Sequence, residues 1–290
     1  MLLKGCGTAL VTPFKDGKVD YETYGKLVAR QVEAGIHFLV PLGTTAETPC
    51  LENEEKCEIL KLTRRLCPDR PVVAGVGTNS PAATIRNIRL LEPYGPDAFL
   101  VVVPFYNKPT QAGIYEYFKA VASATSKPVI AYNVPGRTGV NMLAETTLKV
   151  ASIPNVVAVK EASGDLAQIG RVIAGRPEGF SVLSGNDDQT LDVVRSGGDG
   201  VISVASNIAP ELMVKLLDLA LAGKSAEAEA LNERLFPLFK ACFVESNPIP
   251  VKAGLSLMGL CGDGMRLPLT TASEATKELM KKVIDDLGIL

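Results

Sequence analysis

The stretch NVVAVKEASGD, residues 155–165, combines the signals of a buried strand and of the helix that follows it. Residues 156–159 form a continuous, mostly β-branched apolar run, which is typical of a parallel strand covered on both faces. The Ser-Gly-Asp sequence at 163–165 then gives a helix-starting signal. Between the two signals stands Lys160, whose burial is unfavourable unless something compensates its charge. A lysine at the end of a buried strand therefore needs an explanation.

The same alternation of apolar strand and amphipathic helix continues along the whole chain. A representative helical segment opens on Asp20 as its cap and stops at Gly35. Asn53, ahead of two glutamates, and Ser80, ahead of a proline, mark similar helix starts. The apolar runs that we expect to be strands are 6–11, 37–42, 72–76, 98–103, 128–133, 156–160, 181–183 and 200–204.

Eight such strand–helix units predict an α/β fold, namely a closed (β/α)8 TIM barrel formed by residues 1–222. A doubly wound open sheet is the alternative. Residues 223–290 have helical periodicity with turn-like interruptions such as Asn247-Pro248, so we expect a helical C-terminal extension.

The composition indicates a protein with a large core and no highly charged surface. The 290 residues are 47% hydrophobic and carry a formal net charge of −2, so neither nucleic acid nor an anionic membrane is an expected partner. The longest apolar run, 98–105, is far shorter than the roughly 20 residues that cross a bilayer. The N-terminal stretch is interrupted by Gly5, Gly7 and Pro13 and does not resemble a signal peptide. We expect a cytoplasmic protein.

Cysteine and histidine usage argues against a metal site. The six cysteines form no CxxC pair and are expected to be buried, reduced thiols. A histidine-built site needs two or three histidines, and the chain has one, His37. The sequence also lacks the Walker A, G-x-S-x-G and G-x-G-x-x-G motifs. We expect no metal ion.

Active sites of TIM barrels lie where the strands end, and polar residues follow several of the predicted strands. If the barrel is correct, one rim carries Thr44, Thr45, Tyr106, Tyr132, Arg137 and Lys160. Taken singly, each has an ordinary structural interpretation: a strand-end lysine can extend to solvent, a tyrosine can pack, and threonines after glycine can form a turn. Their coincidence on one rim favours a functional interpretation.

The residue types on this rim suit imine chemistry. Desolvation disfavours the ammonium form of lysine, and a neutral lysine forms a Schiff base with a carbonyl compound. The protonated imine then accepts electrons from an adjacent carbanion, as in aldolases that use no metal. A tyrosine can transfer protons, Thr44 and Thr45 can bind a small carboxylate, and Arg137 can bind a second one.

The same residues belong to a recognisable pattern. The chain resembles the 4-hydroxy-tetrahydrodipicolinate synthase (dihydrodipicolinate synthase) family over essentially its full length, within the wider superfamily of pyruvate-dependent class I aldolases. The stretch YNVPGRTG, which contains Arg137, is what indicates the synthase. The matching stretches are GTALVTPF (7–14), GTTAE (43–47), PFYNKPT (104–110), YNVPGRTG (132–139), VVAVKEASGD (156–165), SGNDD (184–188) and GVISVASN (200–207).

The resemblance implies a role for each residue on the rim. Lys160 is expected to form the Schiff base with pyruvate, and Tyr132 to relay protons beside it. Thr44 is expected to link Tyr132 to Tyr106, which in the family reaches in from a neighbouring subunit.

The remaining site residues concern substrate binding. The resemblance implies that Thr44 and Thr45 hold the carboxylate of pyruvate, that Arg137 binds (S)-aspartate 4-semialdehyde, and that Ile202 offers a backbone carbonyl. The implied reaction belongs to lysine and diaminopimelate biosynthesis and needs no cofactor. The implied assembly is a homotetramer, a dimer of dimers.

Two departures from the family pattern matter. Ala46 stands where GTTGE has glycine, which we expect to be harmless unless that position needs a positive φ. Lysine-sensitive relatives carry histidine, glutamate and tyrosine at a dimer-interface site, where only Asn79 fits here. The corresponding residues of this chain are Pro49, Asn53, Lys56, Ala83 and Phe105. Because Lys56 would repel a cationic ligand, we expect weak or absent inhibition by lysine.

The sequence leaves two other functions open. A sibling aldolase, such as N-acetylneuraminate lyase or a keto-deoxy sugar acid aldolase, would share Lys160 and the threonines but not need Arg137. A catalytically silent barrel that binds a metabolite or a partner protein would need none of these residues together.

Overall fold

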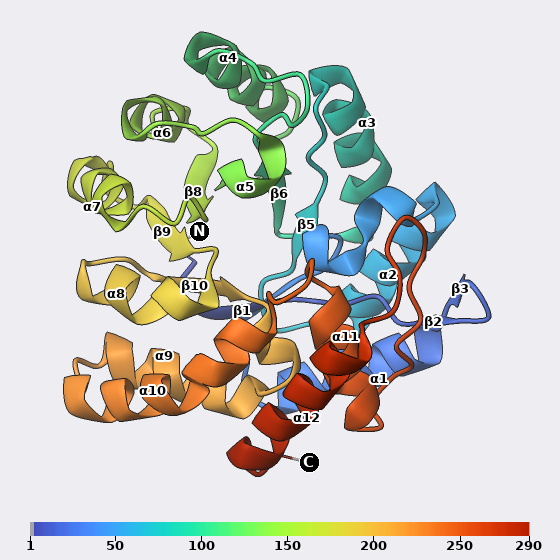
Figure 1. Cartoon of the computed structure of the whole chain (residues 1–290). Coiled ribbons are helices and arrows are strands. Elements are labelled where there is room, and N and C mark those ends of the chain that lie inside the picture. The colour runs from blue at the N-terminus through green and yellow to red at the C-terminus, as the bar shows by residue number, and fades with distance from the viewer. Residues whose placement is uncertain (1–2, 290) are drawn as a thin grey trace.

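Eight parallel strands close into a barrel in the computed structural model, which describes residues 3–289 (Figure 1). The hydrogen-bonded strand order is β4-β1-β10-β9-β8-β7-β6-β5, and a parallel bridge between Leu39 and Val72 joins the two ends. The predicted barrel is confirmed and the open sheet is wrong. The strands are β1 (Gly5–Ala9), β4 (Phe38–Val40), β5 (Val73–Gly75), β6 (Ala98–Val102), β7 (Val129–Asn133), β8 (Val156–Glu161), β9 (Ser181–Ser184) and β10 (Gly200–Ser203).

Helices cover the outside of the barrel, and several begin where the sequence predicts. The Asp20, Ser80 and Asp165 side chains each accept a hydrogen bond from a backbone N–H of the first helical turn. Asn53 is the first helical residue, but the cap is Glu52. The helices are α1 (Tyr21–Glu33), α2 (Asn53–Leu66), α3 (Pro81–Leu91), α4 (Gln111–Ala122), α6 (Ala144–Ala151), α7 (Leu166–Gly175), α8 (Thr190–Arg195) and α9 (Pro210–Leu221).

Short helical turns complete several of the loops. They are η1 (Thr44–Ala46), η2 (Thr48–Cys50), η3 (Glu92–Tyr94), α5 (Pro135–Thr138), η4 (Asp187–Gln189) and η5 (Ala205–Asn207). All of them except η3 come after a strand and before the next helix, so they lie at the carboxyl end of the barrel: η1 and η2 after β4, α5 after β7, η4 after β9 and η5 after β10.

The pleat of the strands divides their side chains between two layers. Tyr132 and Ile202 belong to an apolar cluster with Phe38, Leu100 and Ile130, which fills the barrel interior. A larger apolar cluster lies between the strands and the helices. Residues paired across adjacent strands lie on the same face of the sheet, so Lys160, the partner of Tyr132 on β8, also points into the barrel. The next pair, Asn133 and Glu161, points outward because successive side chains of a strand alternate between the two faces.

One hairpin was not predicted. Strands β2 (Phe14–Lys15) and β3 (Lys18–Val19) pair antiparallel around Asp16 and Gly17, which have φ values of 51° and 74°. An Asp-Gly pair between two short strands is a typical hairpin turn, so the signal was present in the sequence.

The C-terminal segment is helical, as expected. It contains α10 (Ser225–Ala241), α11 (Ile249–Leu257) and α12 (Glu274–Leu287), and α10 packs against α9 while α12 packs against α10 and α11. Figure 1 shows α10, α11 and α12 in orange to red, with the C-terminus at the end of α12. No helix within residues 3–289 is long and apolar enough to span a membrane.

The six cysteines form no disulfide, and the imidazole of His37 has a neighbour at each ring nitrogen. All six cysteines are free; Cys6, Cys67 and Cys242 are buried, but the other three are partly exposed, contrary to the prediction that all would be buried. His37 Nδ1 accepts the N–H of Cys6 at 3.1 Å, and Nε2 lies 3.1 Å from Asp218.

Candidate active site

Lys160 lies inside the barrel next to Tyr132. The two residues are paired in the register of β7 and β8, and Lys160 is only 5% exposed. Its Nζ lies 4.3 Å from the centroid of the Tyr132 ring. Within residues 3–289, this nitrogen has neither an ion-pair nor a hydrogen-bond partner. An amine in such surroundings is available for chemistry once it is neutral.

Gly185 and Asp187, which follow β9, form part of the surroundings of Lys160. A Cβ at Gly185 would lie 3.1 Å from Cε of Lys160, so glycine leaves room for the lysine. Asp187 is 2% exposed and accepts backbone N–H groups from Val204 and Ala205 at 2.9 and 3.0 Å. Burial raises the pKa of Asp187, an effect that these hydrogen bonds and the charge of Lys160 oppose.

A cavity of about 470 Å³ lies at the carboxyl end of the barrel. Thr44, Tyr132 and Arg137 all line it, so three of the predicted site residues share one cavity. Thr45 and Ile202 are buried and are not among the lining residues. Lys160 is not among the lining residues either, but its Nζ lies against the ring of Tyr132, which is.

Asn247 connects two of the predicted substrate-binding residues. Its Nδ2 donates to Oγ1 of Thr45 at 2.9 Å, and its backbone carbonyl accepts a hydrogen bond from Nη2 of Arg137 at 3.2 Å. Asn247 also lines the cavity and is 5% exposed. Sequence reasoning missed this residue, because Asn247-Pro248 carried only a turn signal.

Tyr106 is not brought to the cavity within one chain. It is 88% exposed, with a φ of 72°, and its backbone N–H donates to Thr138 at 3.3 Å. Its neighbour Phe105 does line the cavity, so Tyr106 projects from the cavity edge into solvent. Within residues 3–289, no hydrogen bond joins Thr44 to Tyr132.

A buried amide–carboxylate network fixes the outer faces of the same two strands. Glu161 and Asn133 are paired in the register of β8 and β7, and Nδ2 of Asn133 donates to the carboxylate at 2.9 Å. The backbone N–H of Ser163 donates to it at 2.9 Å as well. Burial raises the pKa of Glu161, and these hydrogen bonds oppose the rise. The network holds the strand ends that carry Tyr132 and Lys160.

The sequence profile of the dihydrodipicolinate synthetase family matches residues 2–287. The chain belongs to this family. It is 46% identical over 294 residues to the 4-hydroxy-tetrahydrodipicolinate synthase of Thermotoga neapolitana, covering 100% of both chains. The crystal structure of the Thermotoga maritima dihydrodipicolinate synthase superposes with a TM-score of 0.98 at 44% identity, covering 100% of both chains. A dihydrodipicolinate synthase variant described as monomeric gives a TM-score of 0.98 at 45% identity, covering 99% of this chain and 97% of its own.

Ala46, the departure from the family's glycine–threonine loop, carries no backbone strain. It lies in η1, and the residue with a positive φ is its neighbour Glu47, at 54°. The position does not need a positive φ, so the strain that alanine would otherwise bring does not arise; that the change is harmless stays a prediction. Across residues 3–289, no three His, Cys, Asp or Glu side chains converge as a metal site would require.

Proposed function

We propose that this protein condenses pyruvate with (S)-aspartate 4-semialdehyde to give 4-hydroxy-tetrahydrodipicolinate, in lysine and diaminopimelate biosynthesis. The observation that carries the proposal is the buried amine of Lys160, which has no ion-pair or hydrogen-bond partner within residues 3–289 and lies against Tyr132. Tyr132 in turn lines a cavity together with Thr44 and Arg137. Membership of the dihydrodipicolinate synthetase family supports the same reaction.

The chemistry begins at Lys160. Its neutral amine adds to the ketone of pyruvate, and loss of water gives an imine. The protonated imine accepts the electron pair left when the methyl group loses a proton, and the resulting enamine forms a carbon–carbon bond with the aldehyde. The amino group of the second substrate then attacks the imine carbon, which closes the ring and releases Lys160.

The other residues hold the reactants and move protons. Tyr132 lies beside the amine and transfers protons to and from the oxygen at the reacting carbon. Thr44 and Thr45 bind the carboxylate of pyruvate, Ile202 contributes its backbone carbonyl, and Arg137 binds the carboxylate of the semialdehyde. Because the imine itself accepts the electrons, this proposal includes no cofactor.

Reductive trapping tests the proposed function. The protein is incubated with pyruvate, reduced with borohydride and mapped by mass spectrometry, and we expect an adduct on Lys160. Absence of the adduct would overturn every Schiff-base function. An adduct without turnover of aspartate semialdehyde would favour a sibling aldolase.

We further propose that the active form is a homotetramer in which Tyr106 of one subunit completes the site of another. Its support is the exposure of Tyr106 at the edge of the cavity, where a second chain can receive it. Sedimentation at assay concentration checks the assembly. A monomer with full activity would contradict the proposal, and the monomeric variant among the similar structures makes this measurement necessary.

Two smaller proposals concern regulation and location. Lys56, Pro49 and Phe105 line the cavity, and the cationic Lys56 disfavours a cationic effector, so we propose that lysine inhibits weakly or not at all. Strong inhibition at low lysine concentration would overturn this. We also propose that the protein acts in the cytoplasm, and fractionation of the source cells checks it.

A further inference from the structure

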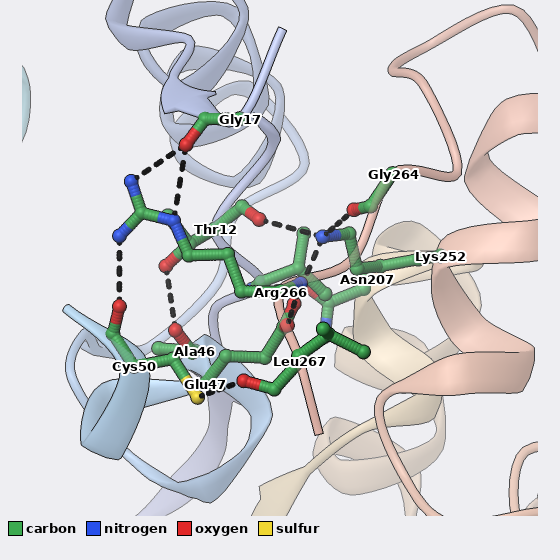
Figure 2. Close-up of polar contacts among 11 residues, drawn as sticks. Thr12, Gly17, Ala46, Glu47, Cys50, Asn207, Lys252, Gly264, Arg266 and Leu267 are labelled. Carbon is green, nitrogen blue, oxygen red and sulfur yellow. Dashed lines mark hydrogen bonds and ion pairs between the residues drawn. The ribbon is translucent and has the colours of Figure 1, made fainter. Parts of the chain in front are cut away.

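Lys252, on α11, is fully buried where three separate segments meet (Figure 2). Its Nζ donates to the backbone carbonyl of Thr12 at 2.9 Å, to Oε1 of Glu47 at 2.9 Å, and to the carbonyl of Gly264. Three acceptors use all three N–H bonds of an ammonium group, so this lysine is charged. The ring of Phe14 adds a further contact, with its centroid 4.4 Å from Nζ.

Glu47, the partner of Lys252, ends the loop that presents Thr44 and Thr45. Glu47 has a left-handed backbone, with φ 54° and ψ 34°, a conformation that non-glycine residues rarely adopt without support. The support is visible in Figure 2, where the carboxylate binds Lys252 on one oxygen. The other oxygen accepts the backbone N–H of Arg266 at 3.1 Å. The side chain thus holds the backbone in its strained turn.

Further hydrogen bonds connect the ion pair to the rest of the loop 43–47. Oγ1 of Thr12 donates to the carbonyl of Ala46 at 2.9 Å, and the carbonyl of the same Thr12 accepts from Lys252. The N–H of Glu47 donates to the carbonyl of Thr44 at 3.1 Å. A displacement of Glu47 would therefore move Thr44 and Thr45, which have no other charged group holding their loop among the contacts of residues 3–289.

We propose that Lys252 and Glu47 are positioning residues for pyruvate binding: their buried ion pair holds the loop 43–47, and with it Thr44 and Thr45, in place beside the cavity. The inference rests on the proposed function, because it assigns these threonines to the carboxylate of pyruvate. It makes the C-terminal segment, through Lys252, Gly264 and Arg266, part of the apparatus that shapes the site.

Three variants separate positioning from stability alone: Lys252→Met, Glu47→Gln and the double variant. Each single change leaves one buried charge without its partner, and the double variant removes both charges, so unfolding measurements should show the double variant recovering most of the stability that the single variants lose. A positioning role predicts that pyruvate binding does not recover in the double variant, because the ion pair that holds Glu47 is still absent while the hydrogen bonds to Ala46 and Thr45 remain.

The readout is the pyruvate concentration that gives half-maximal borohydride trapping on Lys160, together with kcat/KM. We expect the half-saturating concentration to rise about 10-fold or more, and kcat/KM to fall by about 100-fold, in both single variants and in the double variant. Arg176→Met is the matched control, since it breaks the pair with Asp199 ahead of β10, at the opposite end of the barrel. The Arg176→Met variant should have a lower free energy of unfolding, but the pyruvate concentration for half-maximal trapping should be unchanged.

The possible outcomes are distinct. If pyruvate binding recovers together with stability in the double variant, or if Arg176→Met shifts it equally, the positioning role is wrong while the proposed function stands. If the unaltered protein gives no adduct on Lys160, the proposed function fails, and the positioning role fails with it.

Discussion

Lys160 and Lys252 are both buried lysines in apolar stretches, yet their amines have opposite surroundings. The amine of Lys252 has three oxygen partners, one of them the carboxylate of Glu47, whereas that of Lys160 has none within residues 3–289. Burial lowers the pKa of Lys252, and the charge of Glu47 opposes this effect. A lysine whose three N–H groups all donate hydrogen bonds is a structural cation. A lysine whose amine donates no hydrogen bond is available as a nucleophile once it is neutral.

Removing the amine of Lys160 tests whether this lysine serves the reaction and not the stability of the fold. Lys160→Met should lower kcat/KM by about 10⁴-fold or more, because no other group can form the imine. Its free energy of unfolding should stay within about 1 kcal/mol of the unaltered protein, since within residues 3–289 no carboxylate forms an ion pair or hydrogen bond with Lys160, and buried Asp187 keeps its backbone hydrogen bonds. Steady-state kinetics and urea denaturation measure the two quantities. Lys160→Arg is the matched variant that keeps the charge, and substantial activity in it would refute the nucleophile's identity.

The converse prediction concerns stability at the paired lysine. Lys252→Met should lower the free energy of unfolding by about 3–5 kcal/mol, because it leaves the carboxylate of Glu47 buried without a cation. Urea denaturation at neutral pH measures this loss. In Lys252→Met with Glu47→Gln, most of it should be restored. An equal loss in Lys160→Met would show that partnership does not distinguish the two lysines.

Both lysines stand in apolar stretches, so this local signal alone does not separate the reactive lysine from the ion-paired one. Lys160 ends the apolar run of β8, and Lys252 lies within the apolar helix α11. Family motifs surround Lys160, whereas the partner of Lys252 is 205 positions away, on a loop of the barrel. A contact over such a separation depends on the closed fold, which no local pattern records.

The fold itself was more accessible than the contacts within it. Buried parallel strands are apolar along their whole length, so all eight runs, such as 156–160, were found with end errors of one or two residues. Helix caps such as Asp20 are equally local signals. Asn247 was missed because its contacts with Thr45 and Arg137 arise only when the C-terminal segment packs on the barrel.

Arg137 tests whether the residues around Lys160 serve the two substrates separately. Arg137→Ala should raise the KM for aspartate semialdehyde by about 10- to 100-fold, since hydrogen bonds to charged groups contribute roughly 1.5–3 kcal/mol. Trapping of pyruvate on Lys160 should be unchanged, because Arg137 is assigned to the second substrate only. Arg137→Lys keeps the charge without the planar fork and should be intermediate. A large effect on pyruvate trapping would remove the separation of roles.

The pH dependence of stability tests a second ion pair close to Lys252. This pair joins Glu55 to Arg266, whose backbone N–H binds Glu47, the partner of Lys252. Both carboxylate oxygens of Glu55 accept hydrogen bonds from Arg266, each at 2.6 Å. These bonds hold the pKa of Glu55 below its ordinary value of 4.5. An acid whose pKa is lower in the folded state stabilises the fold above the unfolded pKa, and this stabilisation is lost as pH falls through the folded value.

Glu55→Gln should therefore lower the free energy of unfolding by about 1 kcal/mol at pH 7, the upper range for a partly exposed pair. The difference from the unaltered protein should shrink below pH 4.5 and vanish once Glu55 is protonated in both states. Urea denaturation across this range measures it, with Glu58→Gln as a control in an exposed pair with Lys61. A difference that persists in acid would mean that the geometry of Glu55, and not its charge, supports Arg266.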